Sequence, residues 1–532
     1  MTLSTTAASA NFLPATAGLD ATKVVGLKSW FGQIIHSFTL DYNGTTVIQQ
    51  TPYINMWNSF RLMTSLSLGD VKLSSNIGFY PDNALSFIFT AAASADGMGV
   101  CNNSSVAVTP VYTGAAGDMQ TPLSTPPGIA GSVYETELGN VGLRQRQQYI
   151  SYDPAAVPLG SSPYSTLLTI AACQQIWKSV VYEKVNGTGA VIGKVATAIM
   201  ATVYLKHIHS FFSMIPLLKG IFLKMTMNLN NTSTQFTVAR AADPPTAAFA
   251  KAGTPLASIT LNSVSNPVGG VCPLMVSSGS AFQPASTLGT AAYIATIQVG
   301  ARCLNSQVAV TDAPLAKSIY LYVPAYTFNP VFEASYLSSP IKQIKYTDVY
   351  QYKVVNIPAN GAGQFNNLLT NGIANIKSVL IIPFYSDAAG AATTGLPAGI
   401  PVYQSPFDPA GTGPTSPLCL LGNFNVVISG QNAIYNTQRY AFEQFNNQLK
   451  GQNSVNGDLT DGLTSSLVSS LDFEMEYCYY YVNVSRMLEV EKSVPKSVQI
   501  VGTNYSAKAV DLQCFIEYEV DISIDSLTGS RV

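Results

Sequence analysis

The chain has 532 residues, of which only 11% are charged, and its 27 Lys and Arg against 29 Asp and Glu leave a net charge of −2. Ordinary soluble domains carry roughly 25% charged residues, so this composition argues against a monomer that is free in solution. The basic residues are scattered, which argues against nucleic-acid binding as the main role because phosphate neutralisation needs grouped cations.

Length and cysteine spacing bound the class of protein further. A chain this long is expected to form two to four domains, each with its own core. Its seven cysteines are an odd number without a CxxC pair, which predicts buried free thiols in a reducing compartment. The first 20 residues show neither a basic leader nor an apolar h-region, so we expect no secretory signal. The longest apolar runs have strand length and contain proline, so we expect no transmembrane segment.

The N-terminal part begins with an aperiodic stretch. Residues 1–22 are rich in Ala, Thr and Ser, which predicts an arm that orders only against a neighbour. Ile34–Tyr42 and Thr45–Gln49 then flank Asn43-Gly44, the strongest short signal for a β-hairpin. Pro52–Leu66 follows with the apolar spacing of a helix.

Two long stretches rich in Ala, Gly, Ser, Thr and Pro, Ala91–Pro127 and Ala241–Thr290, predict surface loops. Between them, Thr202–Ile208 alternates like a strand, Ser210–Leu218 contains a proline turn, and Gly220–Leu229 alternates again. We interpret this strand, connector and strand as the end of a first domain.

The C-terminal half consists of short β-rich runs separated by turn clusters, with no alternating helices. This spacing favours antiparallel sandwiches over a parallel sheet. The predicted strands are Tyr293–Gln298, Ser318–Tyr326, Lys353–Ile357, Val379–Tyr385, Leu420–Ser429, Leu471–Ser485, Ser497–Val501 and Ala509–Ile524.

Candidate chemistry is sparse. On a strand, His207 and His209 share a face as two metal ligands might, but no third ligand stands at a suggestive spacing, and His36 is remote in sequence. We therefore favour a surface or interface role for these histidines, and a solvated strand face for Arg144 and Arg146. No GxSxG elbow, phosphate loop, calcium loop or carboxylate pair is recognisable. The sequence predicts no catalytic, cofactor-binding or metal-binding residue, which favours a structural role.

Several segments of the second half nevertheless resemble one family. They are SPFDPAGTGPTSP at Ser405–Pro417, LGNFNVVISGQN at Leu421–Asn432, YAFEQF at Tyr440–Phe445, KSVLIIPFYSD at Lys377–Asp387, the stretch Asn456–Arg486 and the ending Val494–Gly529. Their order is similar to the second jelly roll of major capsid proteins of polinton-like viruses and virophages, in the lineage of adenovirus hexon and large DNA virus capsids. VYLKHIHSFFSMIPLLKG at Val203–Gly220 is similar to the unit that closes the first jelly roll.

The resemblance implies an all-β chain with two consecutive eight-stranded jelly-roll β-sandwiches, long loops and a few short helices. The implied divisions are an N-terminal arm at 1–22, a first jelly roll at 23–250 with an excursion loop at about 91–127, a loop or linker region at 251–310, and a second jelly roll at 311–532.

The function implied by the resemblance is structural. Three chains would form a pseudo-hexagonal capsomer, and capsomers would tile an icosahedral shell around a double-stranded DNA genome. The implied partners are neighbouring capsomers, penton and minor capsid proteins, with no specific nucleic-acid site. Such a protein is made and assembled in an infected host cell and resides in the virion.

Two other classes of function remain open at this point. One is a trimeric receptor- or carbohydrate-binding β-sandwich, such as a spike. The other is a secreted β-sandwich hydrolase, which should show paired carboxylates in a cleft.

Overall fold

The computed structural model describes residues 2–6, 24–27, 30–66, 202–217, 222–230, 232–240, 320–385, 419–434, 440–453, 479–485, 494–506 and 509–525, the further strands given below and a few single positions. These residues form antiparallel sheets with a few short helices, so the all-β expectation is confirmed. Within this part of the chain, no helix is long and apolar enough to cross a membrane.

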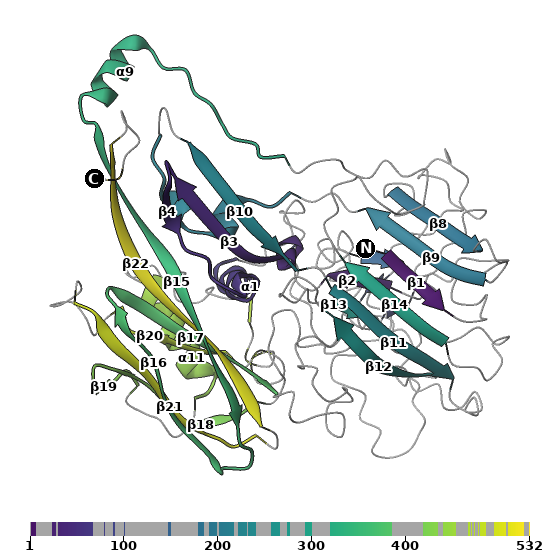
Figure 1. Ribbon diagram of the computed structural model, residues 1–532. Helices are drawn as coiled ribbons and strands as arrows, with labels where there is room; N and C mark the ends of the chain where they lie inside the picture. Colours follow the sequence, from purple (N-terminus) through teal and green to yellow (C-terminus); the bar gives the residue numbers. More distant parts are fainter. Residues whose placement is uncertain are drawn as a thin grey trace, which may run out of the picture.

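The C-terminal half is a jelly roll (Figure 1). Lettered B to I in chain order, its two sheets read B-I-D-G, which is β15-β22-β17-β20, and C-H-E-F, which is β16-β21-β18-β19. The strands are β15 (Ile341–Ile357), β16 (Gly363–Ile373), β17 (Ile376–Tyr385), β18 (Leu421–Ile428), β19 (Gln431–Asn432), β20 (Tyr480–Asn483), β21 (Lys496–Asn504) and β22 (Val510–Asp525). This confirms an eight-stranded jelly roll in the second half.

Most strands of this half agree with the sequence pattern. β17, β18, β21 and β22 coincide with predicted strands, and Lys353–Ile357 is the end of the longer β15. Leu471–Ser485 is wrong in extent: among its described residues only Tyr480–Asn483 form a strand, whereas Phe473, Tyr477 and Tyr479 are buried outside it. Aromatic residues favour strands and buried packing alike, so composition did not separate the two.

The sheet β15-β22-β17-β20 is buried on both faces. The pairs Val379↔Ile516 and Ile381↔Cys514 lie on the face toward the second sheet of the jelly roll, and all four side chains are buried. The next pair, Leu380↔Phe515, points to the opposite face because side chains alternate along a strand. It is buried as well, so this outer face has its own cover.

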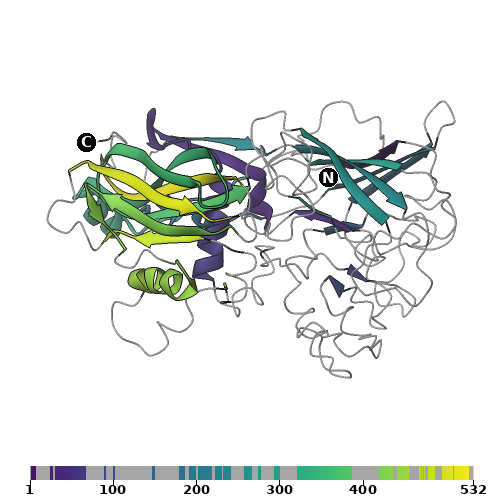
Figure 2. The ribbon, with the colours of Figure 1, turned by 90° about the horizontal axis from the view of Figure 1, so that it is seen from below.

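The cover comes largely from the N-terminal part of the chain. Helix α1 (Ile54–Ser65) places the Trp57 ring centroid 6.2 Å from that of Phe515, and the Phe60 ring centroid 5.4 Å from that of Tyr481. A second helix, α11 (Phe442–Asn453), packs on β20, where Gln448 Oε1 accepts a hydrogen bond of 2.9 Å from the Asn483 amide. It lies outside the two sheets in Figure 2. One hydrophobic core therefore contains residues from both ends of the chain.

The predicted hairpin is confirmed. β3 (Ile35–Tyr42), preceded by the 3₁₀ turn η1 (Phe31–Ile34), pairs with β4 (Thr45–Ile48) through Asn43 and Gly44, which have φ angles of 45° and 83°. Positive φ at both central residues is the geometry of a type I′ turn, which favours Asn-Gly. β10 (Leu223–Leu229) pairs on the other side of β3 and confirms the strand predicted there.

The segment before β10 differs from the prediction. Thr202–Ile208 was expected to be a strand, but Leu205–Ile208 forms the helical turn α7, and Phe211–Met214 forms α8. The apolar residues Leu205, Ile208 and Phe211 recur every three positions, a spacing that suits successive helical turns as well as a loose alternation. Ile208 and Phe211 are buried.

The other described strands of the first half form a separate six-stranded sheet, β12-β11-β14-β1-β9-β8, and two smaller ones. The large sheet contains β12 (Ala257–Ser265), β11 (Thr232–Arg240), β14 (Tyr293–Val299), β1 (Thr2–Thr6), β9 (Val191–Ala198) and β8 (Ser179–Val185). The smaller sheets contain β13 (Leu274–Val276), β2 (Val24–Leu27) and β7 (Gln147–Tyr149), and β5 (Phe89–Thr90) and β6 (Val100–Cys101).

Two expectations change here, and one is confirmed. Thr2–Thr6, expected to be part of an arm that waits for a neighbour, pairs with β9 and β14 of its own chain. Ala257–Ser265, expected within a loop or linker, pairs with β11; its β-branched alternation was hidden by the Ser- and Ala-rich surroundings. The strand predicted at Tyr293–Gln298 is β14. Most of Ala91–Pro127, together with Arg144 and Arg146, lies outside the described residues.

Candidate assembly surfaces

The described residues show two kinds of surface that matter for assembly: a polar junction between the two halves of the chain, and an exposed apolar segment. The junction is built on β15, the edge strand of its sheet. An edge strand presents unpaired backbone groups, which either attract another strand or need a cover.

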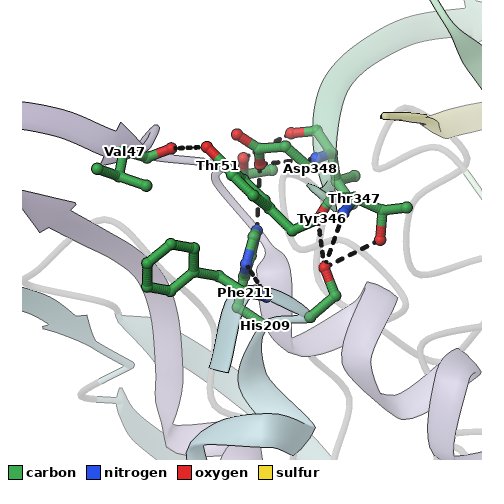
Figure 3. A network of polar contacts seen from close by, with 9 residues as sticks. Val47, Thr51, His209, Phe211, Tyr346, Thr347 and Asp348 are labelled. Atoms are coloured by element: carbon green, nitrogen blue, oxygen red, sulfur yellow. Dashed lines mark hydrogen bonds and ion pairs between the residues drawn. The ribbon is translucent and has the colours of Figure 1, made fainter. Parts of the chain in front are cut away.

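Hydroxyl groups from the first half cap this edge (Figure 3). Ser210 Oγ accepts a hydrogen bond of 2.9 Å from the Thr347 amide and donates one of 2.7 Å to the Thr347 carbonyl oxygen. Two residues further on, Thr51 Oγ1 donates to the Val349 carbonyl oxygen at 2.7 Å. At Thr347 and Val349, side chains of the same chain therefore occupy the edge of β15, so another strand cannot pair with it there.

A buried hydrogen bond between a histidine and an aspartate lies beside these hydroxyls. His209 Nδ1 accepts a hydrogen bond of 3.2 Å from the Phe211 amide, which leaves the ring proton on Nε2. That Nε2–H points at Asp348 Oδ1, 3.3 Å away. The same carboxylate oxygen accepts from the Val349 amide at 2.7 Å, and Asp348 also bonds to the Tyr518 hydroxyl. The buried carboxylate is thus satisfied from three directions, as a buried charge requires.

Tyr346 forms the aromatic side of the junction, with one directed hydrogen bond and one ring contact. Tyr346 donates its hydroxyl hydrogen to the Val47 carbonyl oxygen at 2.5 Å and packs edge-on against Phe211, with ring centroids 5.3 Å apart. Burial, and then the Asp348 carboxylate, raise the pKa of Tyr346, so the phenol stays a hydrogen-bond donor. The junction therefore joins β4, the α7–α8 connection and β15 by both packing and directed hydrogen bonds.

The three histidines do not gather. His209 belongs to the junction, whereas the His36 ring packs edge-on against Tyr53, with centroids 4.9 Å apart. His207 lies in α7 beside Tyr204, and burial, with smaller contributions from Lys206 and Arg61, lowers its pKa to about 4. Within the described part of the chain, no three His, Cys, Asp or Glu side chains are grouped as metal ligands would be. The helical turn at Leu205–Ile208 removes the shared strand face that the sequence suggested for His207 and His209.

The burial of two of the seven cysteines is described, and both agree with the sequence prediction. Cys419 and Cys514 are buried free thiols. Burial raises the pKa of Cys514, which makes this thiol unreactive. Of the other five cysteines, Cys101 belongs to strand β6, and the remaining four lie outside the described residues.

The second surface is the segment Tyr320–Leu337, which we call the bridge segment because it precedes β15. Figure 1 shows its helix α9 (Pro330–Leu337) standing away from the sheets. None of its residues is buried; Tyr322 is 88% exposed and Val331 is 77% exposed. The prediction of a strand at Ser318–Tyr326 is wrong for Tyr320–Tyr326, because no strand pairs with it. Its aromatic and β-branched residues suit a strand, but pattern alone cannot say whether a sheet edge is available.

Comparisons with known proteins were made at the level of sequence and structure. No protein-family model matches the chain, and no curated protein matches it. Among solved structures, the major capsid protein of mavirus aligns over 100% of this chain and 82% of its own, with 10% identity and a TM-score of 0.34. A chain from the cryo-EM structure of the Sputnik virophage aligns over 100% and 80%, with 11% identity and a TM-score of 0.35. The Faustovirus major capsid protein aligns over 94% and 73%, with 10% identity and a TM-score of 0.29. These overlays are loose, so the functional argument rests on the strand order and contacts of the chain itself.

Proposed function

We propose that this chain is the structural major capsid protein of a DNA virus, a non-enzymatic subunit with two jelly rolls whose trimer is the building block of the shell. The observation that carries the proposal is the B-I-D-G and C-H-E-F strand order of β15–β22. Jelly rolls of this kind are typical of viral capsid and lectin domains. Six segments of the same half resemble major capsid proteins in sequence, which favours a capsid domain over a lectin domain.

The way the jelly roll is buried supports a role as a tile rather than as a free binding domain. Both faces of its β15-β22-β17-β20 sheet are covered, the outer one by α1. The junction of Ser210, His209 and Asp348 fixes the first-half elements against β15. A subunit that transmits lateral contacts needs this rigidity, because curvature of a shell is set by the angles between subunits.

Composition supports the same conclusion. A subunit that buries large lateral faces against its neighbours needs less charged surface than a free monomer does. The charged fraction of only 11% agrees with such a subunit. Its 28 tyrosines suit interfaces, where the ring packs and the hydroxyl finds a partner. We propose that the trimer is a pseudo-hexagonal capsomer, that it tiles an icosahedral shell around double-stranded DNA, and that penton and minor capsid proteins complete this shell in the virion.

The division between the two jelly rolls belongs to the proposal as well. β14 pairs with β11 and β1, so the first half extends at least to Val299. The second jelly roll begins with β15 at Ile341. We place the connection between them in residues 300–340, which includes the bridge segment.

The test is to purify the full chain and determine its mass by light scattering and its shape by negative-stain imaging. We expect three times the chain mass and particles with three-fold symmetry and a hexagonal outline. A chain that stays monomeric at micromolar concentration and under assembly conditions contradicts the proposal. A trimer that lacks a hexagonal outline and binds glycans would instead favour the receptor-binding class.

A further inference from the structure

The bridge segment is an exposed apolar surface that no described element covers. Seven of its side chains are large, apolar and more than half exposed: Tyr320, Leu321, Tyr322, Val323, Tyr326, Val331 and Phe332. Single exposed apolar residues are ordinary on a protein surface, but a contiguous set of this size is not. We propose that the bridge segment is a contact between subunits and lies against a second copy of this chain. This inference rests on the trimer proposed above and assigns one of its contacts.

The exposed area is of the size that a stable contact needs. Large aromatic side chains bury about 150–250 Å² each, so the exposed fractions of the four aromatic members alone correspond to roughly 400–700 Å², to which the three aliphatic members add. A specific protein–protein interface of standard size buries about 800 Å² per partner, whereas the largest patch on a monomer is usually about 300–600 Å². The segment is thus sufficient to form most of one side of an interface.

The segment has defined structure before it meets a partner. Asn329 caps α9 by accepting a hydrogen bond of 3.0 Å from the Val331 amide, and Pro330 occupies the first helical position, where a missing N–H costs nothing. The Phe328 ring lies between those of Tyr326 and Phe332, with centroids 6.4 Å and 5.0 Å away. Because little order has to be gained on binding, more of the contact energy remains as affinity.

The base of the segment is anchored to the body of the molecule. The Tyr336 hydroxyl donates to the Leu217 carbonyl oxygen, and Lys342 Nζ lies 3.9 Å from the centre of the Tyr336 ring. The anchor brings a second exposed apolar set next to the segment: Met214, Leu217 and Phe222, which is 71% exposed. Leu217 therefore lies beside the base of the segment, at the end of the molecule where α9 stands (Figure 1).

The chemistry of the segment favours a second copy as the partner. Glu333 is the only Asp, Glu, Lys or Arg between Tyr320 and Leu337, so the matching surface must itself be apolar and nearly uncharged. A nucleic acid or an anionic membrane surface would require cations here. The chain supplies a surface of the required kind in Met214, Leu217 and Phe222, and in a cyclic trimer the segment of each subunit reaches the next subunit by one repeated contact.

The direct test uses a photoreactive benzoylphenylalanine in place of Tyr322 in the full chain, co-expressed with a second copy that carries a different affinity tag. After irradiation we expect a covalent product of two chains that contains both tags. The matched control places the same group at Leu368 on β16, which is also exposed, and should give no such product. Products confined to one chain, or equal products from both positions, would overturn the inference.

A variant of the same surface gives a quantitative check. Tyr322→Ser combined with Val331→Ser removes two exposed side chains, so the melting temperature of the subunit should not change. Loss of two central interface anchors should raise the concentration at which the trimer dissociates by about 100-fold or more, whereas Leu368→Ser should leave it unchanged. A wild-type chain that never forms trimers refutes the proposed function. Trimers of normal stability in the double variant refute only the role of the bridge segment.

Discussion

Asp348 shows how much of the molecule depends on one carboxylate. It belongs to β15, accepts from the His209 ring of the first half, and receives its other bonds from Val349 and Tyr518. A buried group with several donors is costly to alter, because each donor left behind loses its partner in a buried site.

We predict that Asp348→Asn destabilises the subunit by about 2–3 kcal/mol, because the amide replaces the charged acceptor and presents an N–H group to one of the donors. Urea denaturation followed by tryptophan fluorescence measures this loss. The control is Asp521→Asn, which breaks the exposed 3.7 Å pair with Lys345 and should cost no more than about 1 kcal/mol. Equal effects of the two changes would show that the junction is not a buried network.

His207 predicts a dependence of stability on pH. Its pKa is lowered from 6.5 to about 4 in the folded chain, first by burial and then by Lys206 and Arg61. The unfolded chain therefore takes up a proton that the folded chain does not, and stability falls as the pH drops from about 6.5 to about 4. Relative to wild type, His207→Gln should lose less stability between pH 7 and pH 5 in urea titrations. A variant with the same loss as wild type would contradict this assignment.

At the scale of elements, sequence patterns gave reliable predictions where neighbouring residues determine the backbone conformation. Asn43-Gly44 favours positive φ at both residues, and the apolar run in Leu420–Ser429 favours a buried strand; both elements are as predicted. Elements that depend on a distant partner were missed. Thr2–Thr6 becomes a strand only because β9 and β14 flank it, and Tyr320–Tyr326 stays unpaired because no edge reaches it.

The candidate site was harder to predict than the fold. The sequence favoured a surface or interface role for the histidines, and His209 does lie at the contact between the two halves of the chain. Its partner Asp348 is 139 positions away in the sequence. No spacing rule connects residues at that separation. In addition, the sequence pattern predicts a strand at Thr202–Ile208, where the structure has the helical turn that orients His209.

Phe424 on β18 tests whether the jelly-roll core is needed for assembly. The residue is 1% exposed, and its ring centroid lies 5.8 Å from that of Tyr440 and 5.1 Å from that of Tyr480. We predict that Phe424→Asp abolishes recovery of soluble trimer, since a buried unpaired carboxylate costs more than about 4 kcal/mol. Gel filtration with light scattering measures the recovery. The neighbouring Asn423→Asp is exposed and should leave the yield intact; normal trimers from Phe424→Asp would contradict the strand assignment.

At the scale of the whole molecule, one question is whether the N-terminal residues pair within their own chain or bind a neighbouring subunit. Ser4 lies opposite Thr296 of β14 on one side and Lys194 of β9 on the other. A proline in the middle of a sheet removes a ladder hydrogen bond and clashes with its neighbours. We predict that Ser4→Pro accelerates amide hydrogen exchange in β9 and β14 of the isolated subunit, whereas Ser4→Ala does not. Unchanged exchange, together with loss of shells, would show instead that residues 1–22 act as an arm on a neighbouring capsomer.

The core that contains both ends of the chain has a consequence for synthesis. β22 is the last long strand to leave the ribosome, and it lies between β15 and β17 while its Phe515 receives Trp57 from α1. Contacts between residues more than 450 positions apart close slowly, because the entropy of the intervening loop is lost before the contact forms. The apolar side of helix α1 therefore stays uncovered until the more than 450 residues that separate Trp57 from Phe515 have been translated. In a cell that produces many copies at once, this interval exposes apolar surface of the nascent chains to aggregation.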